Sequence, residues 1–243
     1  MNNISISVIT VTLNCEKDIV GLIISLESQK DKNFTWIVQD GVSTDRTTEI
    51  ISQVDIKDVK VISGPDSGIY DAMNRAIDRC LTDYYLVVGA DDRLDSDAIA
   101  NYRRIAVESQ PDFVAMGVRI GKNTLFPKKG YGWLYGMYGE SSCHSVGLLI
   151  KRELHDRYGA YNKQFSFVAD QLFVKTCLKD GASIEREHCV AGNFASGGYS
   201  SINVSFLLFE FALMQLLTEK NKLLQIFILT ARLIKNLKYF RSP

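Results

Sequence analysis

A chain of 243 residues, 46 % of them apolar, can bury one sizeable core, so we expect a single α/β domain followed by a tail. The 28 basic and 28 acidic side chains balance, which argues against a nucleic-acid-binding protein that relies on a broad basic surface. The five cysteines are scattered without a C-x-x-C pair, so neither a disulfide framework nor a structural zinc site is supported, and a reducing cytoplasm is the simplest location.

Strand and helix patterns alternate along the first half of the chain. The apolar residues of "EKDIVGLIISLESQ" recur at i, i+3, i+4 and i+7, the spacing of one helical face. Strands separated by helices of this length need crossover connections, so we expect an α/β fold with a doubly wound, mostly parallel central sheet and helices on both faces. Strands are predicted at residues 4–13, 34–40, 59–63 and 84–89, and helices at residues 16–29, 43–54 and 68–81.

The second half has a less regular pattern. A glycine- and tyrosine-rich loop lies between two predicted strands and suits a lid over a substrate, although aromatic surface loops without such a role are common. The predicted elements are a helix at about residues 95–110, strands at 113–120 and 145–151, a helix at 169–179 and a strand at 183–190.

Acidic residues stand at the ends of two predicted strands. Asp40 ends one strand, and Asp91 and Asp92 follow another. Ligands of open α/β sheets bind beyond the carboxyl ends of the parallel strands, so three carboxylates would face one crevice. Such oxygen ligands suit Mg²⁺ or Mn²⁺ carrying phosphate oxygens. The alternative is a solvated turn. As an exposed strand-end carboxylate, Asp92 should be replaceable without loss of the fold.

A glycine-rich turn leads into the helix of "SGPDSGIYDAMNRAI", whose N-terminal N–H groups and dipole favour an anion. The sequence contains neither G-x-x-x-x-G-K-S/T nor a strand-anchored G-x-G-x-x-G, so Walker-type NTPases and dinucleotide-dependent oxidoreductases lose their best support. A Ser/His/Asp hydrolase lacks its G-x-S-x-G motif.

Four segments, "SVITVTLN", "VQDGVSTDRT", "SGPDSGIYDAMNRAI" and "VVGADD", in this order, resemble the N-terminal half of the family 2 glycosyltransferases, which have a GT-A fold and use nucleotide sugars. The "PD-G-IYDAMN" block is typical of the branch that builds bacterial capsule, exopolysaccharide, O-antigen or colanic acid. The resemblance extends through "CHSVGLLIKRELHDRYGAYNKQFSFVADQLFVK" to "GGYSS" and covers about residues 4–201. It implies a nucleotide-sugar-binding half at about residues 1–95, an acceptor-binding half at 96–201 and a separate tail at 202–243.

The resemblance implies roles for the polar residues of a donor site. Asp92 would be the metal ligand, and Asp91 would lie nearer the ribose or the sugar. Asp40 would accept a hydrogen bond from the nucleobase. Gly41 departs from the family pattern, because many relatives have a second aspartate there. The other donor-site residues would be Asp66, Asp71 and Asn74.

Three further residues are implied on the acceptor side. Asp170, in "FVADQLF", falls where the family keeps its general base, and Ala169 precedes it where an acidic pair is frequent. His144 would lie near the acceptor or the diphosphate, or else would be a histidine satisfied within the fold. Trp133 could stack on a sugar ring, or it could be a surface aromatic residue; the same holds for Tyr131, Tyr135 and Tyr138.

The resemblance predicts a metal-dependent, inverting glycosyltransferase that uses Mn²⁺ or Mg²⁺. It would move a sugar from a nucleoside diphosphate donor to an acceptor hydroxyl, on a lipid-linked glycan, in bacterial surface polysaccharide biosynthesis. Two alternatives belong to other classes: a catalytically silent nucleotide-sugar binder, and a scaffolding partner in a glycan assembly complex.

The tail after residue 200 is apolar, with six basic and two acidic side chains. Charges interrupt it before about eighteen apolar residues accumulate, so a membrane-spanning helix is not expected. It could lie on the inner face of the cell membrane, pack on the body as a helical hairpin, or join two copies of the chain. The N-terminal "MNNISISVITVTLN" lacks the basic segment of a signal peptide, so we expect a cytoplasmic protein.

Overall fold

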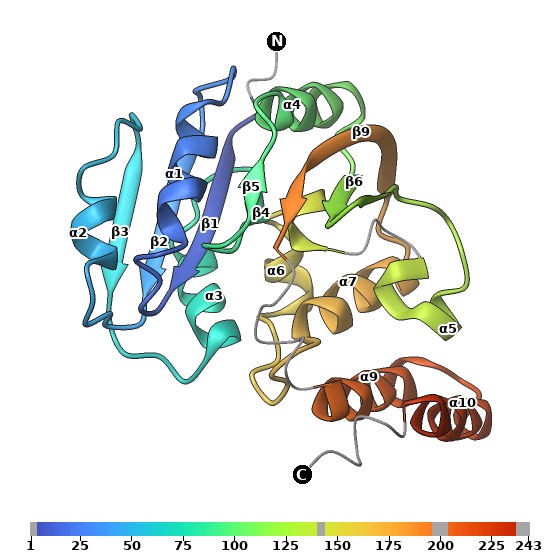
Figure 1. The fold of residues 1–243 in the computed structure, drawn as a ribbon. Coiled ribbons are helices and arrows are strands. Elements are labelled where there is room, and N and C mark those ends of the chain that lie inside the picture. The colour runs from blue at the N-terminus through green and yellow to red at the C-terminus, as the bar shows by residue number, and fades with distance from the viewer. Residues whose placement is uncertain (1–3, 140–143, 196–203, 237–243) are drawn as a thin grey trace.

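A central sheet flanked by helices organises the body of the protein in the computed structural model, which describes residues 4–139, 144–195 and 204–236 (Figure 1). Within these residues nine strands form one sheet, in the order β3-β2-β1-β4-β8-β6-β9-β5 with β7 paired to β6. The strands are β1 (Ile6–Thr12), β2 (Thr35–Asp40), β3 (Val59–Ser63), β4 (Tyr84–Val87), β5 (Arg93–Leu94), β6 (Phe113–Ile120), β7 (Asn123–Leu125), β8 (Leu148–Lys151) and β9 (Ile184–Phe194).

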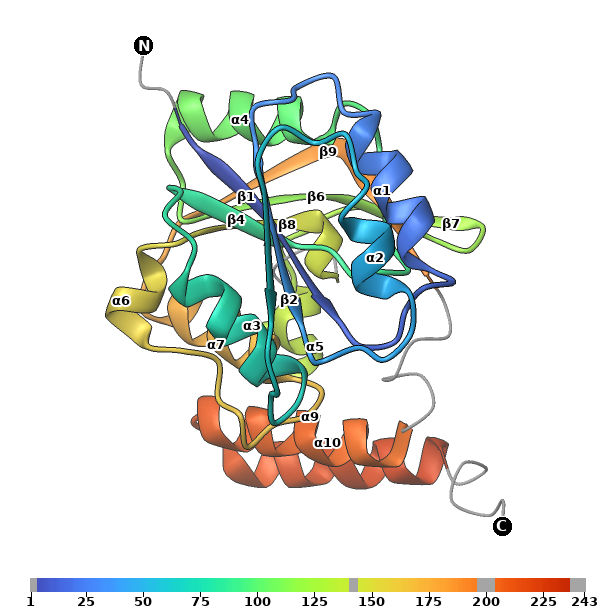
Figure 2. The ribbon, with the colours of Figure 1, turned by 90° about the vertical axis from the view of Figure 1, so that its left-hand side faces the viewer.

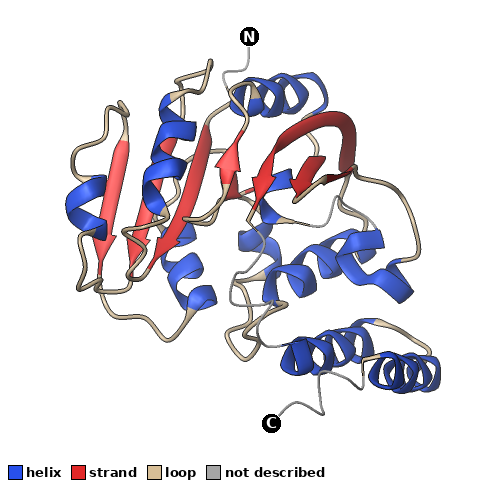
Figure 3. Cartoon of the chain, viewed as in Figure 1, coloured by secondary structure: helices blue, strands red, loops and turns tan. Residues whose placement is uncertain are grey.

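Helices cover both faces of this sheet (Figure 3). Adjacent strand residues point to opposite faces, so Val8 packs with α1, α2 and α4, whereas Ile9 packs with α3, α6 and α7. Burial on both faces explains why the central strands β1 and β4 are almost unbroken runs of buried residues. The helices are α1 (Ile19–Glu27), α2 (Thr47–Ile51), α3 (Ile69–Asp78), α4 (Ala98–Ser109), α5 (Gly132–Tyr135), α6 (Leu154–Tyr158), α7 (Ala169–Lys179), α9 (Val204–Thr218) and α10 (Lys222–Lys235), with 3₁₀ turns η1 (Gly136–Gly139) and η2 (Ser145–Gly147).

The N-terminal half of the sheet is parallel, as predicted. The pairs β1–β2, β2–β3 and β1–β4 are all parallel, and α1, α2 and α3 form the crossovers. The carboxyl ends of these strands therefore meet at one edge of the sheet. The prediction of an α/β fold whose N-terminal strands form a parallel sheet with helical crossovers is confirmed.

The C-terminal half of the sheet is mixed rather than parallel. β8 runs antiparallel to both β4 and β6, whereas β6 and β9 are parallel. The strand predicted at 145–151 begins as the turn η2, so only Leu148–Lys151 pairs with neighbours. The strand predicted at 183–190 continues to Phe194, where its last residues pair with the unpredicted β5.

The helix predicted at 43–54 is reduced to α2. Asp45 accepts hydrogen bonds from the N–H and the hydroxyl of Thr47, at 3.0 and 2.6 Å, and also from the N–H of Glu16, at 3.0 Å. This local turn uses the residues ahead of Thr47, so the helix begins later than its pattern indicates.

The tail folds as a hairpin of α9 and α10 that packs on the body beside α5 and α7 (Figure 2). Met214 and Gln215 on its inner side are buried, and Gln215 Nε2 donates to the Trp133 carbonyl oxygen at 2.6 Å. Glu219 at the end of α9 pairs with Lys175 and Lys179 of α7, at 2.7 and 3.0 Å. In the described part of the chain, no helix combines the length and the hydropathy needed to cross a membrane.

Candidate functional site

The ends of β1, β2 and β3 bring polar residues into register around Asp40. Thr12 lies beside Asp40 and Asp40 beside Ser63. Asp40 is fully buried, and its carboxylate accepts hydrogen bonds from the hydroxyls of Thr12 and Ser63, both at 2.9 Å. Ser43 donates two more, from its hydroxyl at 2.5 Å and its N–H at 2.9 Å.

These hydrogen bonds determine the charge of Asp40. Burial alone would raise the pKa of this carboxyl, but the hydrogen bonds from Ser43, Ser63 and Thr12 outweigh it and hold the pKa below its usual value. Asp40 is therefore an ionised residue that fixes the strand ends. Its lone pairs are occupied, so a nucleobase would contact it by replacing one of these donors.

Asp66 lies against Gly41, next to Asp40. A Cβ atom at position 41 would lie 2.8 Å from Asp66 Oδ2. The other oxygen of Asp66 accepts the N–H of Gly68 at 2.9 Å, at the start of α3. The glycine at 41 thus leaves room for a partly exposed carboxylate that reaches this edge from the loop after β3.

Asp91 and Asp92 fold around Gly89 at the end of β4. A Cβ atom on Gly89 would lie 2.8 Å from Asp91 Oδ1 and 3.0 Å from Asp92 Oδ2, so the two carboxylates share one small space. Asp92 accepts the N–H of Gly89 at 3.1 Å and that of Ala195, after β9, at 3.0 Å. The expected exposure of Asp92 is wrong: its side chain is only 2 % exposed, because it joins the β4 loop to the end of β9.

Burial raises the pKa of Asp92 to about 7, and the neighbouring Asp91 carboxylate adds to this rise against the two N–H donors. Within the described residues, no three His, Cys, Asp or Glu side chains gather as a metal-binding group. A pair of carboxylates alone nevertheless fits Mg²⁺ or Mn²⁺, which use one or two protein carboxylates and take other ligands from substrate phosphates and water. A cation there would also relieve the cost of the charge on Asp92.

His144 lies near the same end of β9. Its ring stacks on Phe194, with centroids 3.6 Å apart, and the next residue, Ala195, donates to Asp92. Burial lowers the pKa of His144 to about 4, so the ring is neutral at physiological pH. A neutral imidazole can donate or accept a hydrogen bond but adds no charge beside the acid pair.

Asp170 and Tyr70 bring together the N-termini of α7 and α3. The Tyr70 hydroxyl donates to Asp170 Oδ1 at 2.7 Å. Burial raises the pKa of Asp170 above its usual value, against the lowering effect of the hydrogen bond from Tyr70. Asp170 is still partly exposed, so it combines a raised proton affinity with access to a substrate. These are the properties of a general base.

Asp71 and Asn74 connect α3 to the segment before Asp170. Asp71 accepts from the N–H of Ser67 and from Lys163 Nζ, both at 3.0 Å, and these bonds lower its pKa to about 2. Asn74 exchanges two hydrogen bonds of 2.9 Å with the backbone of Tyr161. In the structure their polar groups hold the 161–163 segment in place, and a donor-site role for them stays a prediction.

Trp133 lies in α5, on the side of the protein that faces the hairpin. Its side chain is 40 % exposed, and its ring contacts Tyr131 with centroids 6.0 Å apart. Tyr131 and Tyr135 are exposed as well, so the loop presents aromatic surface. The side chain of Tyr138 and the "GGYSS" segment lie outside the described residues.

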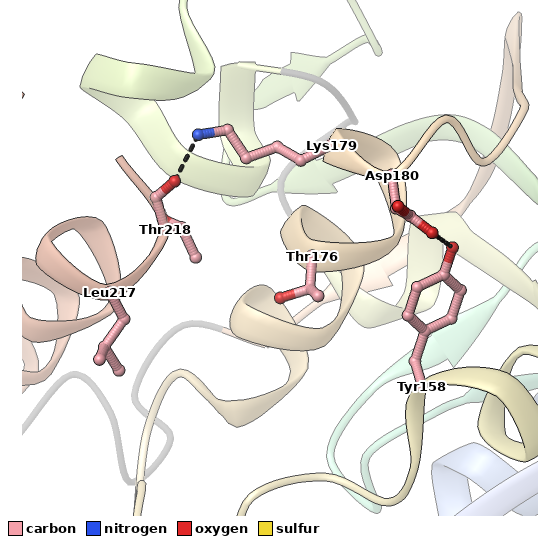
Figure 4. A pocket seen from close by; sticks show the side chains of 6 residues that line it. All are labelled: Tyr158, Thr176, Lys179, Asp180, Leu217 and Thr218. Carbon is pink, nitrogen blue, oxygen red and sulfur yellow. Dashed lines mark hydrogen bonds between the residues drawn. The ribbon is translucent and has the colours of Figure 1, made fainter. Parts of the chain in front are cut away.

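A hollow of about 480 Å³ lies between α7 and α9 (Figure 4). Polar side chains that line it already have partners: Lys179 donates to the backbone carbonyl oxygen of Thr218 at 2.5 Å, and the Tyr158 hydroxyl donates to Asp180 at 2.8 Å. The hollow lies at the carboxyl end of α7, whereas Asp170 lies at the opposite end. It is therefore separate from the acidic site.

Two contacts that shape this site cannot be predicted from local sequence. Tyr70 lies in "SGPDSGIYDAMNRAI", but no sequence pattern pairs it with Asp170, which lies 100 residues later. Lys163, a partner of Asp71, stands in a stretch without periodicity. Only the folded chain brings these residues together.

The profile of the family described as Glycosyl transferase family 2 matches residues 7–166. A PGL/p-HBAD biosynthesis glycosyltransferase of Mycobacterium bovis is 30 % identical over 202 residues, which cover 80 % of this chain and 78 % of the relative. A Mycobacterium tuberculosis protein with the same description matches to the same extent.

Solved structures share the fold. S. aureus TarS 1-349 in complex with UDP-GlcNAc superposes with a TM-score of 0.69 at 20 % identity, over 93 % of this chain and 70 % of TarS 1-349. The mannosyltransferase PcManGT from Pyrobaculum calidifontis, in complex with GDP-Man and Mn²⁺, superposes with a TM-score of 0.66 at 15 % identity, over 98 % and 76 % of the two chains. With a family profile over most of its body and relatives 30 % identical along most of their length, the chain belongs to glycosyl transferase family 2.

Proposed function

We propose that this glycosyltransferase inverts the anomeric carbon as it moves a sugar from a nucleoside diphosphate to an acceptor hydroxyl in bacterial surface-glycan synthesis. Family membership and the "PD-G-IYDAMN" block support the reaction class and the pathway. The mycobacterial relatives, named for PGL/p-HBAD biosynthesis, are consistent with it. A lipid-linked glycan is the proposed acceptor.

The contact between Tyr70 and Asp170 carries the proposal for the chemistry. Asp170 is a partly exposed carboxylate whose pKa is raised by burial, and one of its oxygens is held by the Tyr70 hydroxyl at 2.7 Å. The carboxylate also accepts backbone N–H groups of the first turn of α7, from Gln171 and from Asp170 itself, and a remaining lone pair would accept the proton. A carboxylate with a raised pKa binds the proton of an attacking hydroxyl more strongly than an ordinary one does.

The transfer requires one displacement. Asp170 takes the proton of the acceptor hydroxyl while that oxygen forms a bond to the anomeric carbon. The bond between this carbon and the diphosphate oxygen breaks, and the electron pair leaves with the nucleoside diphosphate. Attack from the face opposite the leaving group inverts the carbon, and the proton stays on Asp170. A single base is sufficient for this reaction.

The donor occupies the carboxyl edge of the parallel strands in this proposal. Asp40 and Asp66 lie at the end that would receive the nucleobase, and Asp91 and Asp92 at the end that would face the diphosphate. Mn²⁺ or Mg²⁺ held by Asp91 and Asp92 would neutralise the charge on the departing diphosphate. The neutral His144 ring would donate a hydrogen bond to a phosphate oxygen or to the acceptor.

The proposal is tested with a panel of UDP- and GDP-sugars. Binding is measured by thermal shift with and without Mn²⁺. Transfer to a lipid-linked acceptor is monitored through the nucleoside diphosphate that it releases, and NMR gives the anomeric configuration of the product. We expect one donor to bind, to bind more tightly with Mn²⁺, and to yield an inverted product. Donor binding without turnover would indicate a silent binder, and absence of binding to any nucleotide would indicate a scaffolding protein.

A further inference from the structure

The outer side of the α9–α10 hairpin carries a stripe of exposed apolar side chains on each helix. On α9 the stripe residues recur every three or four positions, and on both helices they lie opposite the residues that contact the body. Phe206 is 66 % exposed and Phe227 is 72 % exposed. Phenylalanine is rarely so exposed on a surface that faces water. The stripe comprises Phe206, Phe209, Leu213 and Leu217 of α9 and Leu223, Ile226, Phe227 and Ile234 of α10.

The charges of the hairpin are divided between its two sides. Its acidic residues, Glu210 and Glu219, face the body: Glu210 accepts backbone N–H groups before α7, and Glu219 pairs with Lys175 of α7. Three lysines, Lys220, Lys222 and Lys235, are exposed instead. The outward surface is therefore apolar and basic, with no acidic side chain among its described residues.

We propose that this outer stripe docks on an anionic lipid bilayer. Apolar side chains arranged along a helix enter the boundary between headgroups and acyl chains, and neighbouring lysines contact lipid phosphates. A second copy of the chain is a poorer occupant, because a symmetric contact through the same stripe would bring the exposed lysines of both copies together. The docking does not depend on the proposed reaction, since it is measured without turnover.

Deletion of the hairpin would remove Met214 and Gln215, which are buried against the body, and would expose the surface that they cover, so the test uses outward residues only. Full-length protein is incubated at low salt with vesicles of equal parts phosphatidylcholine and phosphatidylglycerol, and with vesicles of phosphatidylcholine alone. We expect partitioning to the anionic vesicles. The triple variant Phe206→Ser, Leu213→Ser, Phe227→Ser should lose this binding while keeping its melting temperature.

The lysines have a matched control on the body. The double variant Lys222→Gln, Lys235→Gln should bind anionic vesicles about 30-fold more weakly. Lys57→Gln, Lys60→Gln changes the net charge equally at the β3 edge of the sheet and should bind as the wild type does. Failure of the wild-type protein to bind anionic vesicles overturns the proposal. So does a dimer in sedimentation velocity that the triple variant dissociates, because the stripe would then join two copies.

A second inference concerns the inner side of the hairpin. Glu210 accepts the N–H of Ser166 at 2.7 Å and that of Phe167 at 2.8 Å, just before the helix that begins at Ala169 and carries Asp170. A carboxylate that receives two consecutive N–H groups fixes the backbone direction there. We infer that Glu210 is a positioning residue for Asp170, an inference that rests on the proposed function.

Glu210→Gln tests this role, because the amide can accept one N–H but turns its own NH₂ toward the other. We expect kcat to fall by about tenfold, the donor KM to stay unchanged, and amide exchange at residues 165–169 to accelerate. Lys179→Ala loosens the hairpin at its other end and serves as the control. Equal loss of kcat in both variants, or unchanged exchange in Glu210→Gln, overturns the inference. A wild-type enzyme without any transfer refutes the proposed function, and the exchange result still decides whether Glu210 orders the segment.

Discussion

Replacement of Tyr70 by phenylalanine tests the assignment of the base most directly. The substitution keeps the buried ring and its edge contact with Tyr161 but removes the hydroxyl that donates to Asp170 at 2.7 Å. This hydrogen bond stabilises the ionised carboxylate, so it lowers the pKa of Asp170. Its loss must raise that pKa. A hydrogen bond to a charged group is worth about 1.5–3 kcal/mol, which corresponds to about 1–2 pKa units.

The measurement is the pH dependence of kcat/KM. Because a general base acts in its ionised form, kcat/KM falls as the pH drops through the pKa of Asp170. In Tyr70→Phe this acidic limb should move about 1–2 units toward higher pH, while activity on the alkaline plateau stays near that of the wild type. An acidic limb that does not move, or that moves to lower pH, refutes the reasoning. Equal loss at every pH would make Tyr70 a structural residue only.

Three further predictions follow from the site. Asp170→Asn should lower kcat by at least about 10²-fold with donor affinity unchanged; loss of donor binding instead would place Asp170 in the nucleotide site. Because the folded-state pKa of Asp92, about 7, lies above that of an unfolded aspartate, the free energy of unfolding without metal should fall by up to about 4 kcal/mol as the pH rises from about 4 to about 7, and should level off above it. Urea titrations should show this loss, and Mn²⁺ or Asp92→Asn should remove it; a pH-independent wild type would contradict the assignment. Trp133→Ala should raise the acceptor KM by about 3–10-fold without changing the donor KM, if its ring stacks on the acceptor.

The parallel half of the fold was predictable because each element there is long enough to show a period. The strands around Val8 and Ile37 are buried on both faces, and the helix from Ile19 has a clear apolar face. The strands β5 and β7 have only two and three residues, too few to show a periodic pattern of apolar residues. Antiparallel β8 was predicted as a strand, but no sequence pattern states its direction.

The acidic site was predictable in position but not in its electrostatics. Topology alone puts Asp40 and Asp92 at the carboxyl ends of β2 and β4, the two parallel strands on either side of β1. The burial of Asp92 depends on the N–H of Ala195, which comes 103 residues later. A contact of this kind leaves no trace in local sequence, so a residue predicted to be exposed became one of the most buried acids of the chain.

Four acids of the candidate site have shifted pKa values and form two groups with opposite effects on the stability of the folded chain. The pKa values of Asp40 and Asp71 are lowered by donors that the fold supplies, so their ionisation stabilises the folded chain at neutral pH. The pKa values of Asp92 and Asp170 are raised by burial, so their ionisation costs stability. An evolved protein keeps such a cost where another group will compensate it. At Asp92 a bound cation would compensate the cost of ionisation. At Asp170 the proton taken from the attacking hydroxyl would compensate it. The first pair therefore holds the strand ends and the segment before α7 in place, and the second pair is where we expect the donor and the acceptor to meet.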